Sequence, residues 1–280
     1  MPIKIYKPTN PGRRNSSVDL FSDITKSEPE KSLIKILKKN SGRNNQGVIT
    51  VRHQGGGVKK YYRLVDFKQD RYGVEGTVMS IEYDPNRGPR VSLVNYTNGD
   101  KAYVLCPDGL KVGDKVISSD KMMESKVGYR LQLQYIPTGL FIYNIELTKG
   151  KGGQLVRGAG MTAQLVGVEG KYAQVRLPSG EIRQIDKECF ANIGTLGNAD
   201  RRLIRWGKAG RMRKRGIKPT VKGKNMNPVD HPHGGGEGHS PIGQKRGQQS
   251  VYGKTVRGVR TRKPGKWSDK FVIKSRRAKK

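Results

Sequence analysis

One stretch of the chain combines residue types that can transfer protons or bind metals. Asn225 to Gly238 contains Asp230, His231 and His233, followed at once by three consecutive glycines. Imidazoles titrate near neutral pH and ligate transition metals, and consecutive glycines let backbone N–H groups approach a phosphate or a ribose. The stretch therefore admits three chemistries: acid–base catalysis, metal binding and polar contact with a nucleic acid.

The catalytic alternatives lack the partners that they need. The run of glycines after His233 is similar to an esterase oxyanion motif, but Ser240 stands in Gly-His-Ser-Pro-Ile, which breaks the nucleophile-elbow pattern. Lys254 lies in a Gly-Lys-Thr that lacks the first glycine of a phosphate-binding loop. No carboxylate pair or nucleophile stands beside His231, and Pro232 disfavours a rigid metal shell. We expect no enzyme activity, no protein-bound metal and no cofactor, with Mg²⁺ entering only through RNA.

Charge identifies the class of partner. The 280 residues carry a formal net charge of +33, with 56 Lys and Arg against 23 Asp and Glu. Residues 201–280 hold 25 Lys and Arg and 3 Asp and Glu, a net charge of +22. Because phosphates neutralise such a surplus and release condensed counterions, a nucleic acid is the expected partner.

Cations interleaved with aromatic, amide and glycine residues predict the contacts. Rings can stack on unpaired bases while cations bind phosphates, although Trp206 could equally anchor the tail on the folded part of the chain. The loop after Gly42 mixes amides, cations and glycines in the same way. The candidate RNA-binding residues are Arg43, Asn44, Arg52, His53, Lys59, Lys60, Arg63, Arg87, Lys149, Lys151, Arg201, Arg202, Arg205, Trp206, Lys208, Arg211, Arg213, Lys214, Arg215, Lys218, Lys222, Asn227, Asp230, His231, His233, Arg260, Arg262 and Lys270.

Short β-rich runs must supply the frame that positions these side chains, so the predicted fold class is mainly β with two small barrels in tandem. The first barrel is expected from Val48–Arg52, Tyr61–Phe67, Thr77–Tyr83, Val91–Tyr96 and Lys101–Cys106. The second is expected from Arg130–Ile136, Phe141–Leu147, Met161–Val168, Lys171–Leu177 and Glu181–Ile185. Asn98-Gly99 predicts a two-residue hairpin turn with positive φ at both residues.

The remaining segments differ in pattern. Met1 to Asn15 predicts an extended basic arm, Ser27 to Lys39 a short helix with capping-box spacing, and residues 108–126 a hinge. After Asn198 the chain is too poor in apolar residues to offset its ordering entropy alone. We therefore expect a basic N-terminal extension (1–40), a first barrel (41–119), a second barrel (120–200) and a basic C-terminal extension (201–280) that folds against RNA.

Several motifs resemble the bacterial-type family of the second large-subunit ribosomal protein. Those that carry the resemblance are Gly42-Arg43-Asn44-Asn45, Arg52-His53, Gly55-Gly56-Gly57, Tyr62-Arg63, Val65-Asp66-Phe67, Glu82-Tyr83-Asp84-Pro85-Asn86-Arg87, Lys149-Gly150-Lys151-Gly152-Gly153-Gln154-Leu155, Gly207-Lys208-Ala209-Gly210, Pro219-Thr220-Val221 and, most closely, Met226 to Gly238. The order is consistent from Pro2 to Arg277, but residues 15–40 match poorly. Val251-Tyr252-Gly253 replaces the family's Pro-Trp-Gly.

The resemblance implies a specific role. It implies an oligonucleotide/oligosaccharide-binding (OB) barrel, then an SH3-like barrel, and extensions that thread 23S rRNA near the peptidyl transferase region. It also implies a bridge to 16S rRNA of the small subunit, support of tRNA binding and contacts with other large-subunit proteins. His231 stands where the family has an imidazole proposed to aid peptide-bond formation, yet the sequence offers it no catalytic partner. The alternatives are a catalytic or metal-dependent RNA enzyme centred on Asp230, His231 and His233, and a free-standing RNA-binding regulator built from the same two barrels.

The expected location follows from what the sequence lacks. No apolar run reaches the ~18 residues of a membrane span, and Met1 to Asn15 has no signal-peptide core. Cys106 and Cys189 have no Cys or His neighbour and predict two buried thiols in a reducing compartment. We expect a soluble protein of cytoplasmic ribosomes with no membrane contact; the alternative is an organelle ribosome of bacterial type.

Overall fold

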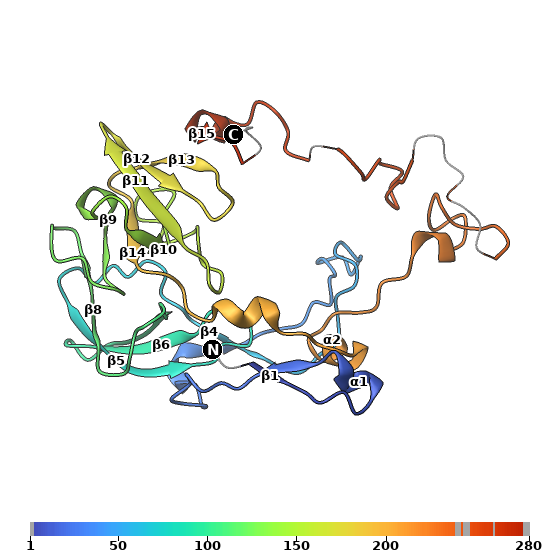
Figure 1. Cartoon of the computed structure of the whole chain (residues 1–280), viewed down its shortest axis with the longest axis horizontal. Coiled ribbons are helices and arrows are strands. Elements are labelled where there is room, and N and C mark those ends of the chain that lie inside the picture. The colour runs from blue at the N-terminus through green and yellow to red at the C-terminus, as the bar shows by residue number, and fades with distance from the viewer. Residues whose placement is uncertain (1–2, 239–241, 243–246, 260, 277–280) are drawn as a thin grey trace. The chain divides into compact units, whose positions relative to one another are not determined.

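The computed structural model describes residues 3–238, 242, 247–259 and 261–276, and the chain forms two compact units. Unit 1 comprises residues 1–38, 59–208 and 268–280, and unit 2 comprises residues 39–58 and 209–267. The chain is mainly β, as the sequence predicts, and the α-helices of its described part, α1 (Pro11–Arg14) and α2 (Ala209–Lys214), are short (Figure 1). Unit 2 is thus built from two excursions of the chain out of unit 1.

The first barrel of unit 1 is organised around the long strand β5 (Glu75–Glu82). β5 pairs antiparallel with both β6 (Val91–Tyr96) and β8 (Lys115–Ser119), and β6 pairs with β7 (Lys101–Leu105). Successive side chains of a strand alternate between its two faces, so one face of each strand can enter the core. Val78, Val94 and Val104 are among the buried residues that fill it.

The hairpin predicted at Asn98-Gly99 joins β6 to β7, but its turn differs from the prediction. The N–H of Tyr96 donates to the carbonyl of Asp100 at 2.9 Å, and the N–H of Gly99 donates to the carbonyl of Tyr96 at 2.9 Å. Gly99 has φ of +87°, whereas Asn98 is not among the residues with positive φ. The loop therefore has three residues with glycine in the left-handed position, a geometry that also matches the twist of the strands.

The second barrel contains a larger apolar core. Leu131, Leu165 and Val175 are fully buried in it. A parallel pairing between β8 and β9 continues the sheet from one barrel into the other, so the strands of both barrels, together with β15 (Val272–Lys274), form one eleven-stranded sheet in the described part of the chain. The strands of the second barrel are β9 (Arg130–Gln132), β10 (Phe141–Tyr143), β11 (Ala163–Glu169), β12 (Tyr172–Arg176), β13 (Ile182–Asp186) and β14 (Phe190–Ile193).

The predicted helix over Ser27 to Lys39 is wrong. The segment forms a 3-10 turn (Lys31–Leu33) and then strand β3 (Ile34–Ile36), which pairs antiparallel with β4 (Tyr61–Arg63). Tertiary contacts override the local helical pattern here, because β4 offers backbone partners and Leu33 packs against a buried cluster of the first barrel.

Two other predictions in this part of the chain are also wrong. Val48–Arg52 is not a strand, since Ile49 makes only an isolated bridge with Arg43. The expected hinge over residues 108–126 contains strand β8, which three polar residues among five had concealed. Its Ser118 and Ser119 are buried all the same.

The terminal segments of unit 1 are also more ordered than predicted. The basic arm forms β1 (Ile3–Ile5), α1 and β2 (Ser17–Asp19), with β1 and β2 paired antiparallel. Near the other end, a 3-10 turn (Trp267–Phe271) leads into β15 (Val272–Lys274), which pairs with the edge of β13. The sequence misses β15 and β14 because neither alternates between apolar and polar residues.

Candidate nucleic-acid interface

Unit 2 is held together by backbone pairing between two segments far apart in the sequence, residues 53–58 and 214–218. The N–H of Lys218 donates to the carbonyl of His53 at 3.0 Å, and the N–H of Gly55 donates to that of Gly216 at 2.9 Å. The N–H of Val58 donates to the carbonyl of Lys214 at 2.9 Å. A glycine-rich segment and an arginine-rich segment thus lie side by side, which brings candidate residues from both into one unit.

Glycines make this pairing possible. At Gly57, where φ is +83°, a Cβ would lie 2.7 Å from the backbone nitrogen of Gly216. Any side chain there would collide with backbone and would also strain the left-handed conformation. The sequence suggests that these glycines admit a ligand, whereas the structure shows that Gly57 admits a neighbouring segment of the same chain.

Unit 2 combines a large net charge with the lack of an apolar core in its described part. Residues 39–58 and 209–267 carry 18 Lys and Arg and 2 Asp and Glu, a net charge of +16. None of the described residues in these ranges is buried. Such a unit gains little from the hydrophobic effect and concentrates like charges, so a polyanion would stabilise it. The candidate residues that it holds are Arg43, Asn44, Arg52, His53, Arg211, Arg213, Lys214, Arg215, Lys218, Lys222, Asn227, Asp230, His231, His233 and Arg262, while Arg260 lies outside the described residues.

The histidine loop of unit 2 is a compact turn, defined here as residues 223–235. The N–H of Gly235 donates to the carbonyl of Met226 at 3.0 Å, and a Cβ at Gly234 would lie 2.2 Å from the carbonyl oxygen of Asn227. The ring of His231 lies against Gly223, where a Cβ would come within 2.5 Å of it. These glycines therefore serve the packing of the loop on itself.

Hydrogen bonds assign one role to each imidazole. Nδ1 of His231 accepts the N–H of His233 at 3.0 Å, and Nε2 of His233 accepts the N–H of Gln249 at 2.8 Å. Each ring must be unprotonated at its accepting nitrogen, which leaves one N–H per ring as a donor. The rings lie 5.0 Å apart, and no group of three His, Cys, Asp or Glu in the described part of the chain could hold a metal. The geometry suits hydrogen-bond donation rather than proton transfer.

Two candidate arginines of unit 1 are used inside the first barrel. Arg63 is 5% exposed and lies 4.0 Å from the carboxylate of Glu82, which also accepts the hydroxyl of Tyr103 at 2.7 Å. Arg87 pairs with Asp84, and its guanidinium lies over the ring of Tyr62. Their cationic groups therefore serve the fold of the first barrel, and Arg63 is too buried to contact RNA.

The other candidates of unit 1 lie at or near its surface. Lys149 and Lys151 are exposed on one loop of the second barrel. Trp206 is half-buried, and its backbone bridges Ser16 of the N-terminal segment, which fits the anchoring role. The remaining candidates, all exposed or half-buried, are Lys59, Lys60, Arg201, Arg202, Arg205, Lys208 and Lys270.

Sequence reasoning missed two buried arginines that organise unit 1. Arg90 is 2% exposed and pairs with Asp19 at 2.6 Å and with Asp23 at 2.9 Å. Burial opposes its charge, but these hydrogen bonds outweigh that cost and raise the pKa of Arg90. Arg130 is fully buried and pairs with Glu146 at 2.9 Å. The only signal in the sequence was a cation placed within or beside an apolar run.

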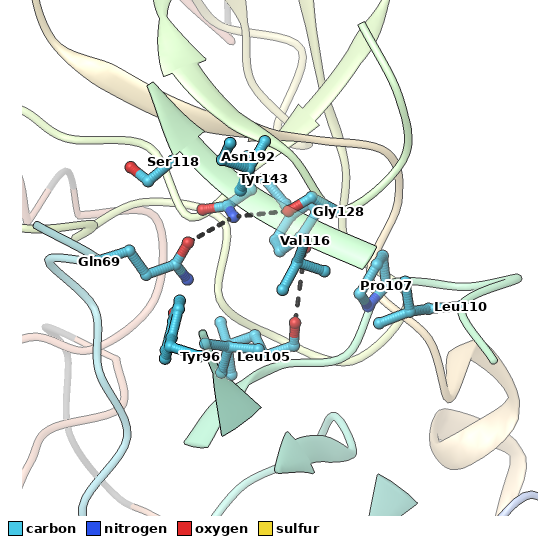
Figure 2. A pocket seen from close by; sticks show the side chains of 12 residues that line it. Gln69, Tyr96, Leu105, Pro107, Leu110, Val116, Ser118, Gly128, Tyr143 and Asn192 are labelled. Carbon is cyan, nitrogen blue, oxygen red and sulfur yellow. Dashed lines mark hydrogen bonds between the residues drawn. The ribbon is translucent and has the colours of Figure 1, made fainter. Parts of the chain in front are cut away.

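A small pocket at the junction of the two barrels does not form a site. Figure 2 shows hydrogen bonds among the residues that line it: the amide of Asn192 donates to Gln69 at 3.0 Å and to the carbonyl of Gly128 at 3.4 Å. The hydroxyl of Tyr143 donates to the carbonyl of Leu105 at 3.5 Å. Burial raises the pKa of Tyr143, so the phenol stays protonated and cannot act as a base. The pocket is a packing gap between two cores.

Two family models match the chain. Residues 30–118 match "Ribosomal Proteins L2, RNA binding N-terminal domain", and residues 126–253 match "Ribosomal Proteins L2, C-terminal domain". The chain belongs to the ribosomal L2 family. It is therefore an RNA-binding protein of the large ribosomal subunit, and the resemblance found in the sequence is confirmed.

The matched ranges agree with the predicted architecture of an N-terminal OB barrel followed by a second barrel. The N-terminal match starts at residue 30, so β3 lies within it. The C-terminal match extends to residue 253 and so includes the histidine loop of unit 2. No described helix has the length and apolar character needed to cross a membrane. The family membership supports a structural role in the ribosome.

Proposed function

We propose that unit 2 is the main rRNA-binding element of this ribosomal L2 protein and that the barrels of unit 1 position it. The observation that carries the proposal is a net charge of +16 on a unit without a buried residue in its described part. Neutralisation by phosphates would remove the self-repulsion and release counterions from the RNA. Any Mg²⁺ at the interface would be bound through RNA.

The finer role rests on family membership. The RNA partner is 23S rRNA, and the histidine loop lies near the peptidyl transferase region. The protein also forms a bridge to 16S rRNA of the small subunit and supports tRNA binding. His231 would position RNA through its N–H, because its other nitrogen already accepts a backbone N–H. Cytoplasmic ribosomes are the proposed location. If the bridge exists, particles whose unit 2 is neutralised should join small subunits less well in sedimentation.

Charge neutralisation within the full chain tests the proposal. Arg213, Lys214 and Lys218 would each be changed to Gln, and log K for rRNA would be measured against log salt. Each lost phosphate contact should lower the slope by about 0.7 to 0.9, so the triple variant should lose about 2 to 3 units. The matched control replaces Lys111, Lys115 and Lys126, which lie on the first barrel or just after it. Equal loss of slope in both variants would contradict the proposal.

A further inference from the structure

A loop of the second barrel presents two lysines on an unusual backbone. Residues 147–153, here the lysine loop, read Leu-Thr-Lys-Gly-Lys-Gly-Gly, with Lys149 and Lys151 exposed. Three glycines among seven residues should make such a loop flexible, because glycine loses the most conformational freedom on ordering. Gly152 and Gly153 are nevertheless buried. Something in the fold must therefore hold the C-terminal half of this loop.

Three hydrogen bonds fix that half. The N–H of Gly152 donates to Oε1 of Glu146 at 3.0 Å, the N–H of Gly153 to the carbonyl of Phe67 at 2.8 Å, and the N–H of Gln154 to that of Ile145 at 2.8 Å. A Cβ at Gly153 would lie 2.0 Å from Oδ1 of Asn144, so only glycine fits. The loop is anchored within one residue of Lys151.

The carboxylate that anchors Gly152 belongs to a buried charge network. Glu146 is 2% exposed, and its other oxygen accepts the N–H of Phe190 at 3.2 Å. Arg130 balances its charge at 2.9 Å and also donates to Oδ1 of Asn192 at 3.0 Å. Burying such a pair costs desolvation that its mutual attraction barely repays, so stability alone does not account for it. The pair instead fixes the position of the loop, because Glu146 accepts the backbone N–H groups of Gly152 and Phe190.

On the surface side of the loop, Lys149 can exchange its ionic partner. Lys149 pairs with Glu188, but the two side chains are 62% and 47% exposed. Exposed pairs contribute little because water and salt screen them. A phosphate could therefore replace Glu188 on Lys149 at low cost, whereas the buried pair beneath would remain intact.

We propose that the lysine loop is a preorganised binding site for the phosphodiester backbone of rRNA and that Glu146, neutralised by Arg130, is its positioning residue. The inference rests on the proposed function, since it names a second contact that the same RNA makes with unit 1. Preorganisation raises affinity because the ordering entropy of the loop is already lost before binding.

A double-mutant cycle in the full-length protein tests the inference, with a transcript of large-subunit rRNA as the probe. Replacing Lys149 and Lys151 by Ala should lower the slope of log K against log salt by about 1 to 2 units. Glu146→Ala should weaken binding, but should add nothing once both lysines are absent, because it acts through them. Glu82→Gln is the matched control, a buried carboxylate of the first barrel whose effect should be independent of the lysines.

Hydrogen exchange separates positioning from unfolding. In the Arg130→Met/Glu146→Leu variant, which removes both charges together, the amide of Gly152 should exchange at least tenfold faster while that of Val175 in the core stays protected. An unchanged slope in the lysine variant, or additive effects of Glu146→Ala and the lysine changes, would overturn the inference. The proposed function fails separately, if the unmodified chain does not bind the transcript or if the unit 2 variant keeps its slope.

Discussion

Unit 1 and unit 2 reach order by opposite routes. Unit 1 contains two apolar cores and also buries ion pairs such as Arg130–Glu146. Unit 2 has no buried residue in its described part and relies on backbone pairing allowed by glycines such as Gly57. Burial of apolar side chains can stabilise a fold without a binding partner, whereas backbone hydrogen bonds that are open to water contribute little net free energy. Unit 1 therefore supplies the apolar cores, whereas unit 2 holds a net charge of +16, nearly half of the chain's +33.

The largest contrast should be in the free energy of unfolding. Leu131 is fully buried, and Leu131→Ala should cost roughly 2–5 kcal/mol because it leaves a cavity. Val229 is 91% exposed, and Val229→Ala should change stability by less than about 0.5 kcal/mol. Urea denaturation followed by the fluorescence of the full chain measures both. Similar losses in the two variants would mean that unit 2 has a core of its own.

A smaller effect should appear in RNA affinity. Gly57→Ala places a Cβ 2.7 Å from Gly216 and should separate residues 53–58 from 214–218. We expect rRNA affinity to fall roughly tenfold, equivalent to about 1.4 kcal/mol, because the competent form of unit 2 becomes rarer. Thermal unfolding of the barrels should be unaffected.

Gly47→Ala is the matched control for this change. Gly47 has φ of +79°, close to that of Gly57, but nothing lies within 4 Å of its missing side chain. It carries the left-handed strain without the collision. If both variants lose the same affinity, strain rather than pairing explains the loss.

The sequence predicts unit 1 better than unit 2 for a physical reason. Alternating burial marks β5 and β12 directly, so these strands were predicted nearly to the residue. Where polar residues enter the sheet, as in β8, the pattern fails because their hydrogen bonds depend on distant partners. The helix predicted over Ser27 to Lys39 fails for the same reason, because β3 forms there by pairing with β4, which is distant in the sequence.

The candidate site shows the limit more sharply. Charge and glycine content correctly identified the class of partner, and the family models confirm it. No local pattern could show that residues 53–58 pair with 214–218, or that Arg63 is buried, because both facts depend on contacts between segments far apart in the sequence. The sequence associates these glycines with a ligand, because a missing side chain leaves room equally for a ligand and for another segment of the same chain.

Alkaline pH should modestly lower the free energy of unfolding of unit 1, which contains Cys106. Burial raises the pKa of the Cys106 thiol to about 11, from an ordinary value near 9. The unfolded thiol ionises first, so the stabilisation is complete below pH 9 and is lost as the pH rises from 9 to about 11. Unfolding free energy at pH 10 should be about 1 kcal/mol lower than at pH 8 from this group. Cys106→Ala should reduce that pH dependence, and an unchanged dependence would show that other groups cause it.

The smallest expected effect is at His231. A hydrogen-bonding role and a proton-transfer role of this side chain predict different rates of peptide-bond formation. Gln can accept the N–H of His233 as Nδ1 of His231 now does at 3.0 Å, and it can still donate through its amide. Ribosomes carrying His231→Gln should therefore form peptide bonds at a rate within about twofold of normal in a single-turnover assay. A ~100-fold slower chemical step would indicate general acid–base catalysis instead. His231→Ala is the control, because it removes both the acceptor and the donor nitrogen of the ring and should impair assembly before it impairs chemistry.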